Sequence, residues 1–382
     1  MSLISRSDRG AVARWWFTID RTLMSSVMLL MAVGVLVSMA ASPPVAERIG
    51  LDSFHFFKGQ VIFLGLGFCV LVVGSFLSTP AVRRLGFLAF IGGLILMALA
   101  LKFGPEIKGS HRWIFMGRLN LQPSELAKPG FVIVASWFLA EHAKRPDMPG
   151  RLLAFLSAGL FIGLLVLQPD FGQTALVTLT FGAMLLVFGI SWTVIGGLLG
   201  TVAMGAGFAY LLVPHVASRI NRFLYPDKGD TFQTDTAVSA FNNGGLMGTG
   251  PGGGVAKMIL PDAHSDFAFA VVGEEFGLIA CLSLMVLFFF IIIRVLQRAK
   301  SEVDPFAALA MTGLVSMFGF QACINMGVNV GLLPAKGMTL PFISYGGSSL
   351  IGTALAMAFV LALARRSPRP VVNNFATQSV AA

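Results

Sequence analysis

The chain has 382 residues, of which 56% are hydrophobic and 12% are charged. Soluble domains carry about 25% charged residues, so a chain with a mean hydropathy of +0.82 could not cover a water-exposed surface. Its surroundings must therefore be largely lipid. The net charge of +9 is attributed to cytoplasmic loops and anionic headgroups rather than to nucleic acid. The three cysteines lie in apolar runs and indicate neither a disulfide framework nor a thiolate metal site.

About ten apolar segments are long enough to cross a hydrocarbon core as helices, which takes roughly 20 residues. The predicted spans are Thr22–Ala41, Phe56–Leu77, Leu85–Leu101, Glu125–Ala140, Leu152–Leu167, Gly172–Ile190, Thr193–Val213, Phe267–Ile293, Pro305–Val330 and Tyr345–Ala364. Unbroken runs such as Leu282–Ile293 lack the alternation of a membrane β-barrel. The predicted fold class is an all-α integral membrane protein, a polytopic bundle of about ten transmembrane helices with one long periplasmic loop.

The distribution of Lys and Arg predicts the orientation. Alternate short loops are densely basic, so the positive-inside rule places both termini in the cytoplasm. This gives a cytoplasmic N-terminal segment (1–21), a transmembrane domain (22–366) and a cytoplasmic tail (367–382) that we expect to be disordered. The long loop 214–266 is then periplasmic. We expect it to be ordered and to pack on the bundle through its apolar residues, which are Phe223, Leu224, Tyr225, Phe232, Phe241 and Leu246.

Two segments resemble known motifs, but the residues around them or their spacing exclude both assignments. The tract Gly244–Gly254 formally matches a dinucleotide fingerprint, but no strand precedes it and a proline stands where the helix should open. We interpret it as a mobile re-entrant loop whose glycines permit positive φ. Ser124 and Lys128 are one residue too far apart for the acylating-serine motif.

Ionisable residues near the outer boundary are the remaining candidates, because membrane spans rarely keep them without a use. Glu125 and Lys128 share one helix face, either as a neutralising ion pair or as a site where Lys128 binds an anion. Asp170 either caps the following helix or contributes a ligand. Asp266 ends the long loop, where it either caps the next helix or acts as a general base at the mouth of a partly apolar cavity.

Six collinear motifs extend over nearly all of residues 15–366. They are Lys108–Ile114, Gln122–Lys128, Gln168–Gly172, Ala263–Phe269, Gly273–Gly277 and Pro341–Ser349. On these motifs the sequence closely resembles the SEDS family of bacterial integral-membrane peptidoglycan glycosyltransferases, which includes FtsW, RodA and SpoVE. Segment 333–340 looks like the cell-division branch, FtsW. The sequence His264-Ser265-Asp266 departs from the commoner His-Thr-Asp but keeps the hydroxyl.

The resemblance implies that the chain polymerises lipid II into glycan strands at the periplasmic face of the inner membrane, for septal synthesis. A lipid II flippase and an elongation-branch, RodA-like polymerase are the alternatives. A flippase needs polar groups at mid-membrane depth, whereas the span centres are nearly free of charge and the ionisable groups cluster at one face. An essential aspartate of the family falls on Asp266, which we assign as general base. The candidate substrate and pyrophosphate ligands are Arg112, Lys128, Glu125, Arg219, Arg222, Lys336, His264 and Ser344.

Partners and cofactors follow from the same resemblance. Family members work with a class B penicillin-binding protein, an FtsI-like transpeptidase, and with other divisome membrane proteins at the septum. Small residues in the span 305–330, including Gly313 and Gly319, either offer a face to the transpeptidase helix or pack within the bundle. No metal-ligand cluster is visible, and Mg²⁺ or Mn²⁺ is left open as a partner of the pyrophosphate.

Overall fold

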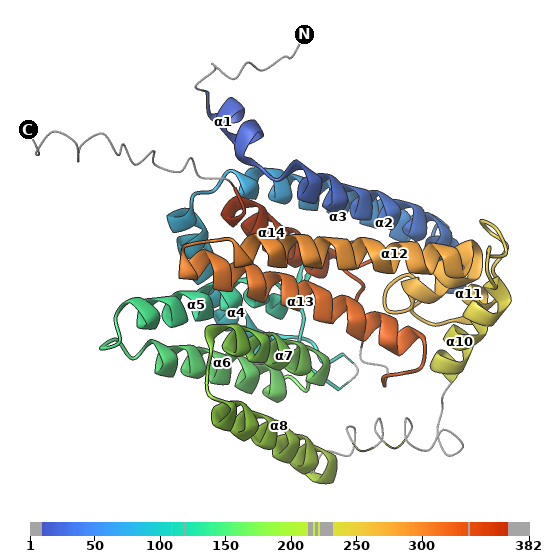
Figure 1. Cartoon of the computed structure of the whole chain (residues 1–382). Helices are drawn as coiled ribbons and strands as arrows, with labels where there is room; N and C mark the ends of the chain where they lie inside the picture. The colour runs from blue at the N-terminus through green and yellow to red at the C-terminus, as the bar shows by residue number, and fades with distance from the viewer. Residues whose placement is uncertain are drawn as a thin grey trace, which may run out of the picture.

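The chain forms a bundle of long helices, most of which are joined by short segments (Figure 1). The computed structural model describes residues 10–107, 109–117, 119–212, 217, 221, 232–334 and 337–365. Its elements are α1 (Ala11–Thr18), α2 (Arg21–Arg48), α3 (His55–Ser75), α4 (Thr79–Phe103), β1 (Ile114–Met116), β2 (Leu119–Leu121), α5 (Pro123–Lys144), α6 (Gly150–Leu167), α7 (Phe171–Phe188), α8 (Trp192–Leu212), α10 (Phe232–Gly244), α11 (Ala256–Ile259), α12 (Ala268–Lys300), α13 (Pro305–Asn329) and α14 (Gly347–Leu363).

Each predicted span coincides with one of these helices, and the all-α membrane fold class is confirmed. Among the described residues, seven helices are long and apolar enough to cross a bilayer. Helix α14 is slightly shorter, with 17 residues, and α5 carries the charged residues Glu125 and Lys128, which lower its hydropathy. Helix α2 continues beyond its predicted end, because Pro43 and Pro44 are accommodated inside it.

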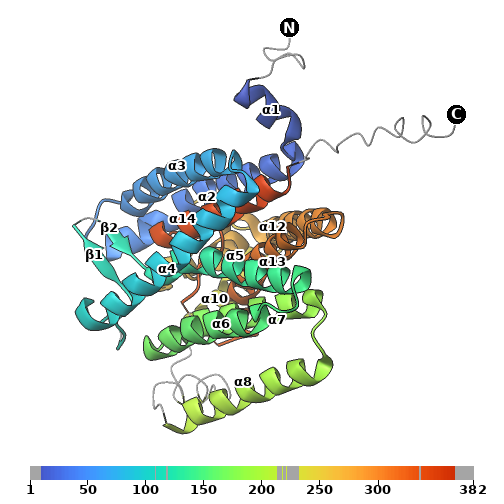
Figure 2. The same cartoon turned by 90° about the vertical axis from the view of Figure 1, so that its left-hand side faces the viewer.

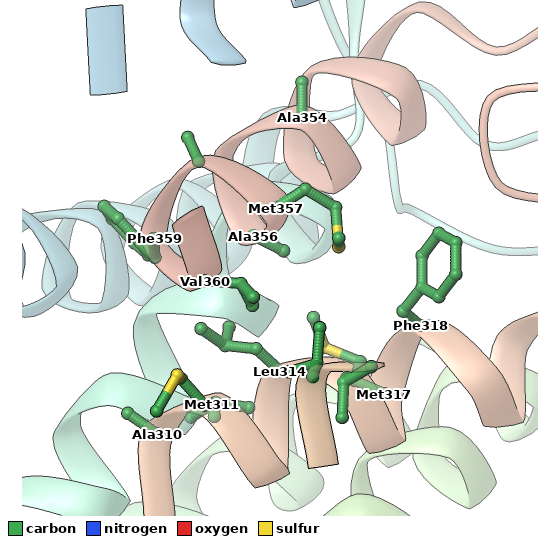
Figure 3. Packing of buried hydrophobic residues seen from close by; sticks show 14 of the residues in the cluster. Ala310, Met311, Leu314, Met317, Phe318, Ala354, Ala356, Met357, Phe359 and Val360 are labelled. Atoms are coloured by element: carbon green, nitrogen blue, oxygen red, sulfur yellow. The ribbon is translucent and has the colours of Figure 1, made fainter. Parts of the chain in front are cut away.

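Helices α13 and α14 form the centre of the bundle. In the most apolar window of α13, 78% of the residues are buried, against 50% or less in the other six spans. Met311 and Leu314 of α13 lie opposite Met357 and Val360 of α14 (Figure 3). Because lipid tails give helices little hydrophobic reason to associate, close packing has to hold these contacts together.

Glycines on α13 and α14 are used for this close packing. A Cβ on Gly352 would lie 2.3 Å from the carbonyl oxygen of Glu125, so α14 packs directly on the α5 backbone. A Cβ on Gly313 would meet Val132 at 2.6 Å and Met184 at 2.8 Å, and one on Gly319 would meet Ile292 at 2.9 Å. Of the two interpretations of these α13 glycines, the structure supports packing within the bundle.

Polar contacts collect at the two ends of the bundle. At one end, Arg294 donates to both carboxylate oxygens of Asp20, and Arg298 and Arg365 donate to the carbonyls of Ala364 and Leu77. The other end carries the β1–β2 hairpin, α10 and α11, while α8 lies at the edge of the bundle (Figure 1, Figure 2). The described candidate site residues lie toward this second end.

Helix α12 is broken at Gly277, whose φ is 78° and ψ is −179°. The glycine-rich tract supplies the hydrogen bonds that the break removes. Leu278 N–H donates to the Gly245 carbonyl at 2.9 Å, and Gly250 N–H donates to the Glu275 carbonyl at 3.1 Å. Buried backbone groups need such partners. The tract does adopt positive φ at several glycines, but the expected mobility does not fit, because these bonds fix it to α12.

The buried carboxylates of Glu274 and Glu275 also bind the end of this tract and the short helix α11 that follows it. Glu274 accepts backbone hydrogen bonds from Val255 (2.8 Å), Ala256 (2.6 Å) and Lys257 (3.0 Å), so it caps α11. Glu275 is paired with the ammonium of Lys257. The acidic motif that follows the long loop therefore serves to dock that loop.

The described part of the long loop packs on the bundle less completely than predicted. Phe241 lies on Phe269, with ring centroids 5.6 Å apart. Phe232 and Leu246 are instead 48% and 65% exposed. The other predicted packing residues, at 223–225, lie outside the described residues, as does the C-terminal tail from 366 onward.

Candidate active site

Asp266 closes a turn that leads into α12. The N–H groups of Ser265 and Phe267 both donate to the Asp262 carbonyl, at 3.0 and 3.3 Å. Phe267 occupies the N-cap position of α12 without a side-chain capping bond. Asp266 therefore stands one residue before the cap position. The Asp266 side chain is half-buried and lies beside Gly337. A Cβ on Gly337 would be 3.5 Å from the Asp266 Oδ2 atom.

Two asparagines of α13 hold the backbone of this turn. Asn325 and Asn329 each donate a side-chain hydrogen bond of 2.9 Å to the Asp266 carbonyl. Asn325 also donates to the Met338 carbonyl at 2.6 Å. The turn before α12 and the segment before α14 are thus tied to the same helix.

His264 and Ser344, two predicted ligands, both make contacts within the protein. The His264 ring stacks on Phe56 with centroids 4.0 Å apart and lies 5.5 Å from the Tyr345 ring. Burial lowers the pKa of its imidazole to about 4, so the ring is neutral at pH 7. The Ser344 hydroxyl accepts from Leu340 N–H at 2.9 Å and closes the turn before α14.

Glu125 and Lys128 form an ion pair of 2.8 Å, with side chains 4% and 2% exposed. Gln173 donates to Glu125 at 2.7 Å, and Lys128 donates to Gln321 at 3.2 Å. The adjoining cavity is about 10 Å³, which is near the lower limit for one water molecule. This geometry favours the ion pair over direct binding of a phosphate.

Arg112 is held against the turn between α6 and α7. It donates to the carbonyls of Gln168 and Pro169 and lies 3.4 Å from the Asp170 carboxylate. Asp170 also accepts from Gln173 N–H at 3.3 Å, which makes it the N-cap of α7. Asp170 therefore has the capping role and is also an ion-pair partner of Arg112.

These contacts join into one buried polar network. It runs from Arg112 through Asp170 and Gln173 to the Glu125–Lys128 pair, and Gln321 continues it by donating to the Thr339 carbonyl at 3.0 Å. Thr339 follows Met338, to which Asn325 is bonded. The predicted cations at 219, 222 and 336 (Arg219, Arg222 and Lys336) lie outside the described residues.

Three amide side chains of α13 were not among the predicted site residues. Gln321, Asn325 and Asn329 recur every four residues in a mostly apolar span, and all three are buried. That spacing puts them on one face of the helix and was the signal available. Within the described residues there is no group of three His, Cys, Asp or Glu side chains that could hold a metal ion.

Most of the chain matches one known protein family. The family model described as "Cell cycle protein", for FtsW, RodA and SpoVE, matches residues 20–368. The chain belongs to the FtsW/RodA/SpoVE family. The resemblance found in the six sequence motifs is confirmed over the whole bundle.

Two relatives of this chain carry the same description. A probable peptidoglycan glycosyltransferase FtsW from Caulobacter vibrioides is 43% identical over 366 residues, covering 95% of this chain and 94% of the relative. One from Coxiella burnetii is 36% identical, covering 90% of this chain and 96% of the relative.

Solved structures of the family agree with the fold. A peptidoglycan synthase complex in which polymerization and crosslinking are coordinated contains a chain with a TM-score of 0.75 and 29% identity, covering 91% of this chain and 97% of that one. The rod shape determining protein RodA of Thermus thermophilus gives a TM-score of 0.67 at 28% identity, with the same coverage.

Proposed function

We propose that this chain is a peptidoglycan glycosyltransferase that polymerises lipid II at the periplasmic face of the inner membrane, for septal synthesis during cell division. FtsW relatives that match about nine tenths or more of the chain support the activity and the division branch. The observation that carries the chemistry is the position of Asp266. Its carboxylate is half-buried beside Gly337, on a turn anchored to α13 and outside the cap of α12.

In the proposed reaction Asp266 is the general base. It takes the proton of the acceptor sugar hydroxyl while the hydroxyl oxygen bonds to the anomeric carbon of the lipid-linked strand, with inversion. The bond from that carbon to the pyrophosphate oxygen breaks, and the undecaprenyl pyrophosphate leaves with the electron pair. A carboxylate that is partly desolvated yet reachable is suited to this proton transfer.

The leaving pyrophosphate needs positive charge. In the described part of the site, the cations of Arg112 and Lys128 are already paired with carboxylates, and His264 is neutral. We therefore assign the pyrophosphate to Arg219, Arg222 and Lys336, with Arg112 and the Glu125–Lys128 pair in support. Mg²⁺ is usually bound by one or two carboxylates together with substrate phosphates. A divalent cation in this reaction would be held chiefly by the pyrophosphate.

The partner in this proposal is a class B penicillin-binding protein, an FtsI-like transpeptidase that crosslinks the new strand. The structural likeness to a chain of a peptidoglycan synthase complex supports it. The other divisome proteins, the septal location and the cytoplasmic placement of both termini belong to the same proposal.

The test is polymerisation of lipid II by the purified protein, with and without its transpeptidase. Asp266→Asn keeps the shape of the side chain but cannot take the proton, so the rate should fall about 10²- to 10⁴-fold. Asp262→Asn, four residues earlier, is the matched control. Asn tolerates the positive φ of 55° at that position, and this variant should stay active. A fully active Asp266→Asn protein would contradict the assignment.

A further inference from the structure

Three amide side chains line one face of α13. Gln321, Asn325 and Asn329 are 4%, 1% and 0% exposed. A buried amide costs free energy unless its polar atoms are hydrogen-bonded, and polar residues inside membrane spans are rare. The bonds that these side chains make therefore indicate why α13 carries them.

Asn329 acts on the first turn of α12 from outside that helix. Its Oδ1 accepts the N–H of Ala270 at 3.0 Å, and its Nδ2 donates to the Asp266 carbonyl at 2.9 Å. The first N–H groups of a helix lack the usual carbonyl acceptor four residues back. The Ala270 N–H donates to the Phe267 carbonyl at 3.0 Å, and Asn329 gives it a second acceptor. Asn329 thus holds both the start of α12 and the Asp266 backbone that precedes it.

Asn325 acts on two chain segments at once. Its Nδ2 donates to the carbonyls of Asp266 (2.9 Å) and Met338 (2.6 Å), which are far apart in sequence. The Asp266 carboxylate faces Gly337, the residue next to Met338. One amide group thus sets the separation between the carboxylate and the segment that it faces.

We infer that Asn325 and Asn329 are positioning residues, which hold the Asp266 carboxylate in place for proton transfer without contacting the substrate. The inference rests on the proposed function, because it gives these residues their role through the base. Two donors from one rigid helix meet on a single carbonyl, which leaves the Asp266 backbone little freedom. A displacement of about 1 Å in a reacting group can cost about 100-fold in rate.

The test replaces each asparagine by leucine, which is similar in size but has no donor. In lipid II polymerisation by the full-length protein with its transpeptidase, Asn325→Leu and Asn329→Leu should lower kcat about 10- to 100-fold. KM should change by less than about twofold, because no substrate contact is removed. Thr312→Val is the matched control, because Thr312 is a buried polar residue of α13 whose hydroxyl donates to its own helix, at the Ala308 carbonyl. Its kcat should match the wild type.

A double-mutant comparison separates positioning from a general structural effect. In an Asp266→Ala background, Asn325→Leu should not lower the residual rate further, because the group that it positions is already absent. A further tenfold loss there would overturn the inference, as would a wild-type kcat in both single variants. If the leucine variants fail to fold, Asn329→Ser is measured instead. It leaves the Asn325 donor in place, and its kcat should fall several-fold at unchanged KM, whereas a wild-type kcat would refute the inference.

The wild-type protein separates failure of this inference from failure of the proposed function. If the wild type does not polymerise lipid II in the presence of its transpeptidase, the proposed function fails. If the wild type is active and the asparagine variants are equally active, the positioning role alone fails.

Discussion

Replacing Lys128 tests the two interpretations of the buried Glu125–Lys128 pair. Lys128→Met removes the ammonium and leaves the Glu125 carboxylate, 4% exposed, with the Gln173 amide as its remaining described partner. Removing one member of a buried ion pair typically costs about 3–5 kcal/mol. The remaining hydrogen bond from Gln173 puts our expectation near the lower value, about 3 kcal/mol.

A second variant removes the stranded charge. In Glu125→Gln with Lys128→Met the pair carries no charge. The Gln321 oxygen loses its donor and the new amide N–H group gains no acceptor, at about 1 kcal/mol each. The double variant should therefore be more stable than Lys128→Met alone. The control is Lys144→Met in the exposed Lys144–Asp304 pair, which should cost about 1 kcal/mol or less.

The assay measures the thermal unfolding midpoint in detergent and, on the same samples, lipid II polymerisation. The ion-pair interpretation predicts that the wild type and Lys144→Met have the highest unfolding midpoints. The double variant should unfold at a lower temperature, and Lys128→Met at the lowest. A Lys128→Met protein as stable as the wild type, with a strongly raised KM, would refute it. That result would establish Lys128 as an anion-binding residue.

Three further predictions concern the bundle and the neighbouring loop. Gly277→Ala should lower the unfolding midpoint strongly, because its φ is 78° and a Cβ would lie 2.4 Å from backbone atoms of the glycine-rich tract; Gly92→Ala, which meets nothing within 4 Å, is the control. Gly313→Leu should reduce the yield of folded protein with or without the transpeptidase, because the side chain would enter the space of Met184. If Gly313→Leu folds normally but no longer co-purifies with the transpeptidase, the α13 glycines form the face that contacts the transpeptidase helix. Burial lowers the pKa of His264 to about 4, so its neutral form contributes stability that is lost as pH falls from about 6.5 towards 4. The unfolding midpoint should fall over that window in the wild type and fall less in His264→Gln; equal slopes would contradict the cause.

The helices were predictable because their signal is local. A run of apolar residues long enough to cross the bilayer identifies each span without any knowledge of its neighbours. The ends were less predictable. Pro43 and Pro44 indicate a stop, yet α2 continues to Arg48, and the break at Gly277 became visible only with the tract that completes it.

The site was predictable in its residues more than in their roles. Asp266 was singled out by its place between loop and span, but the sequence could not show that Phe267 takes the cap position. His264 and Arg112 were assigned from charge and motif alone. Their stacking and pairing partners, Phe56 and Asp170, are remote in sequence, and only the fold brings them together.

The break in α12 also indicates how deep the proposed active site lies. Counting from Arg294, which is paired with Asp20 at the opposite end, about 20 helical residues cover a hydrocarbon core of roughly 30 Å. They reach the neighbourhood of Glu274 and Gly277, where the glycine-rich tract joins the helix. On this count we expect the Asp266 carboxylate to lie beyond the acyl chains, in the headgroup layer. There a hydrated disaccharide can approach it while the isoprenoid tail of the same molecule stays dissolved in the bilayer.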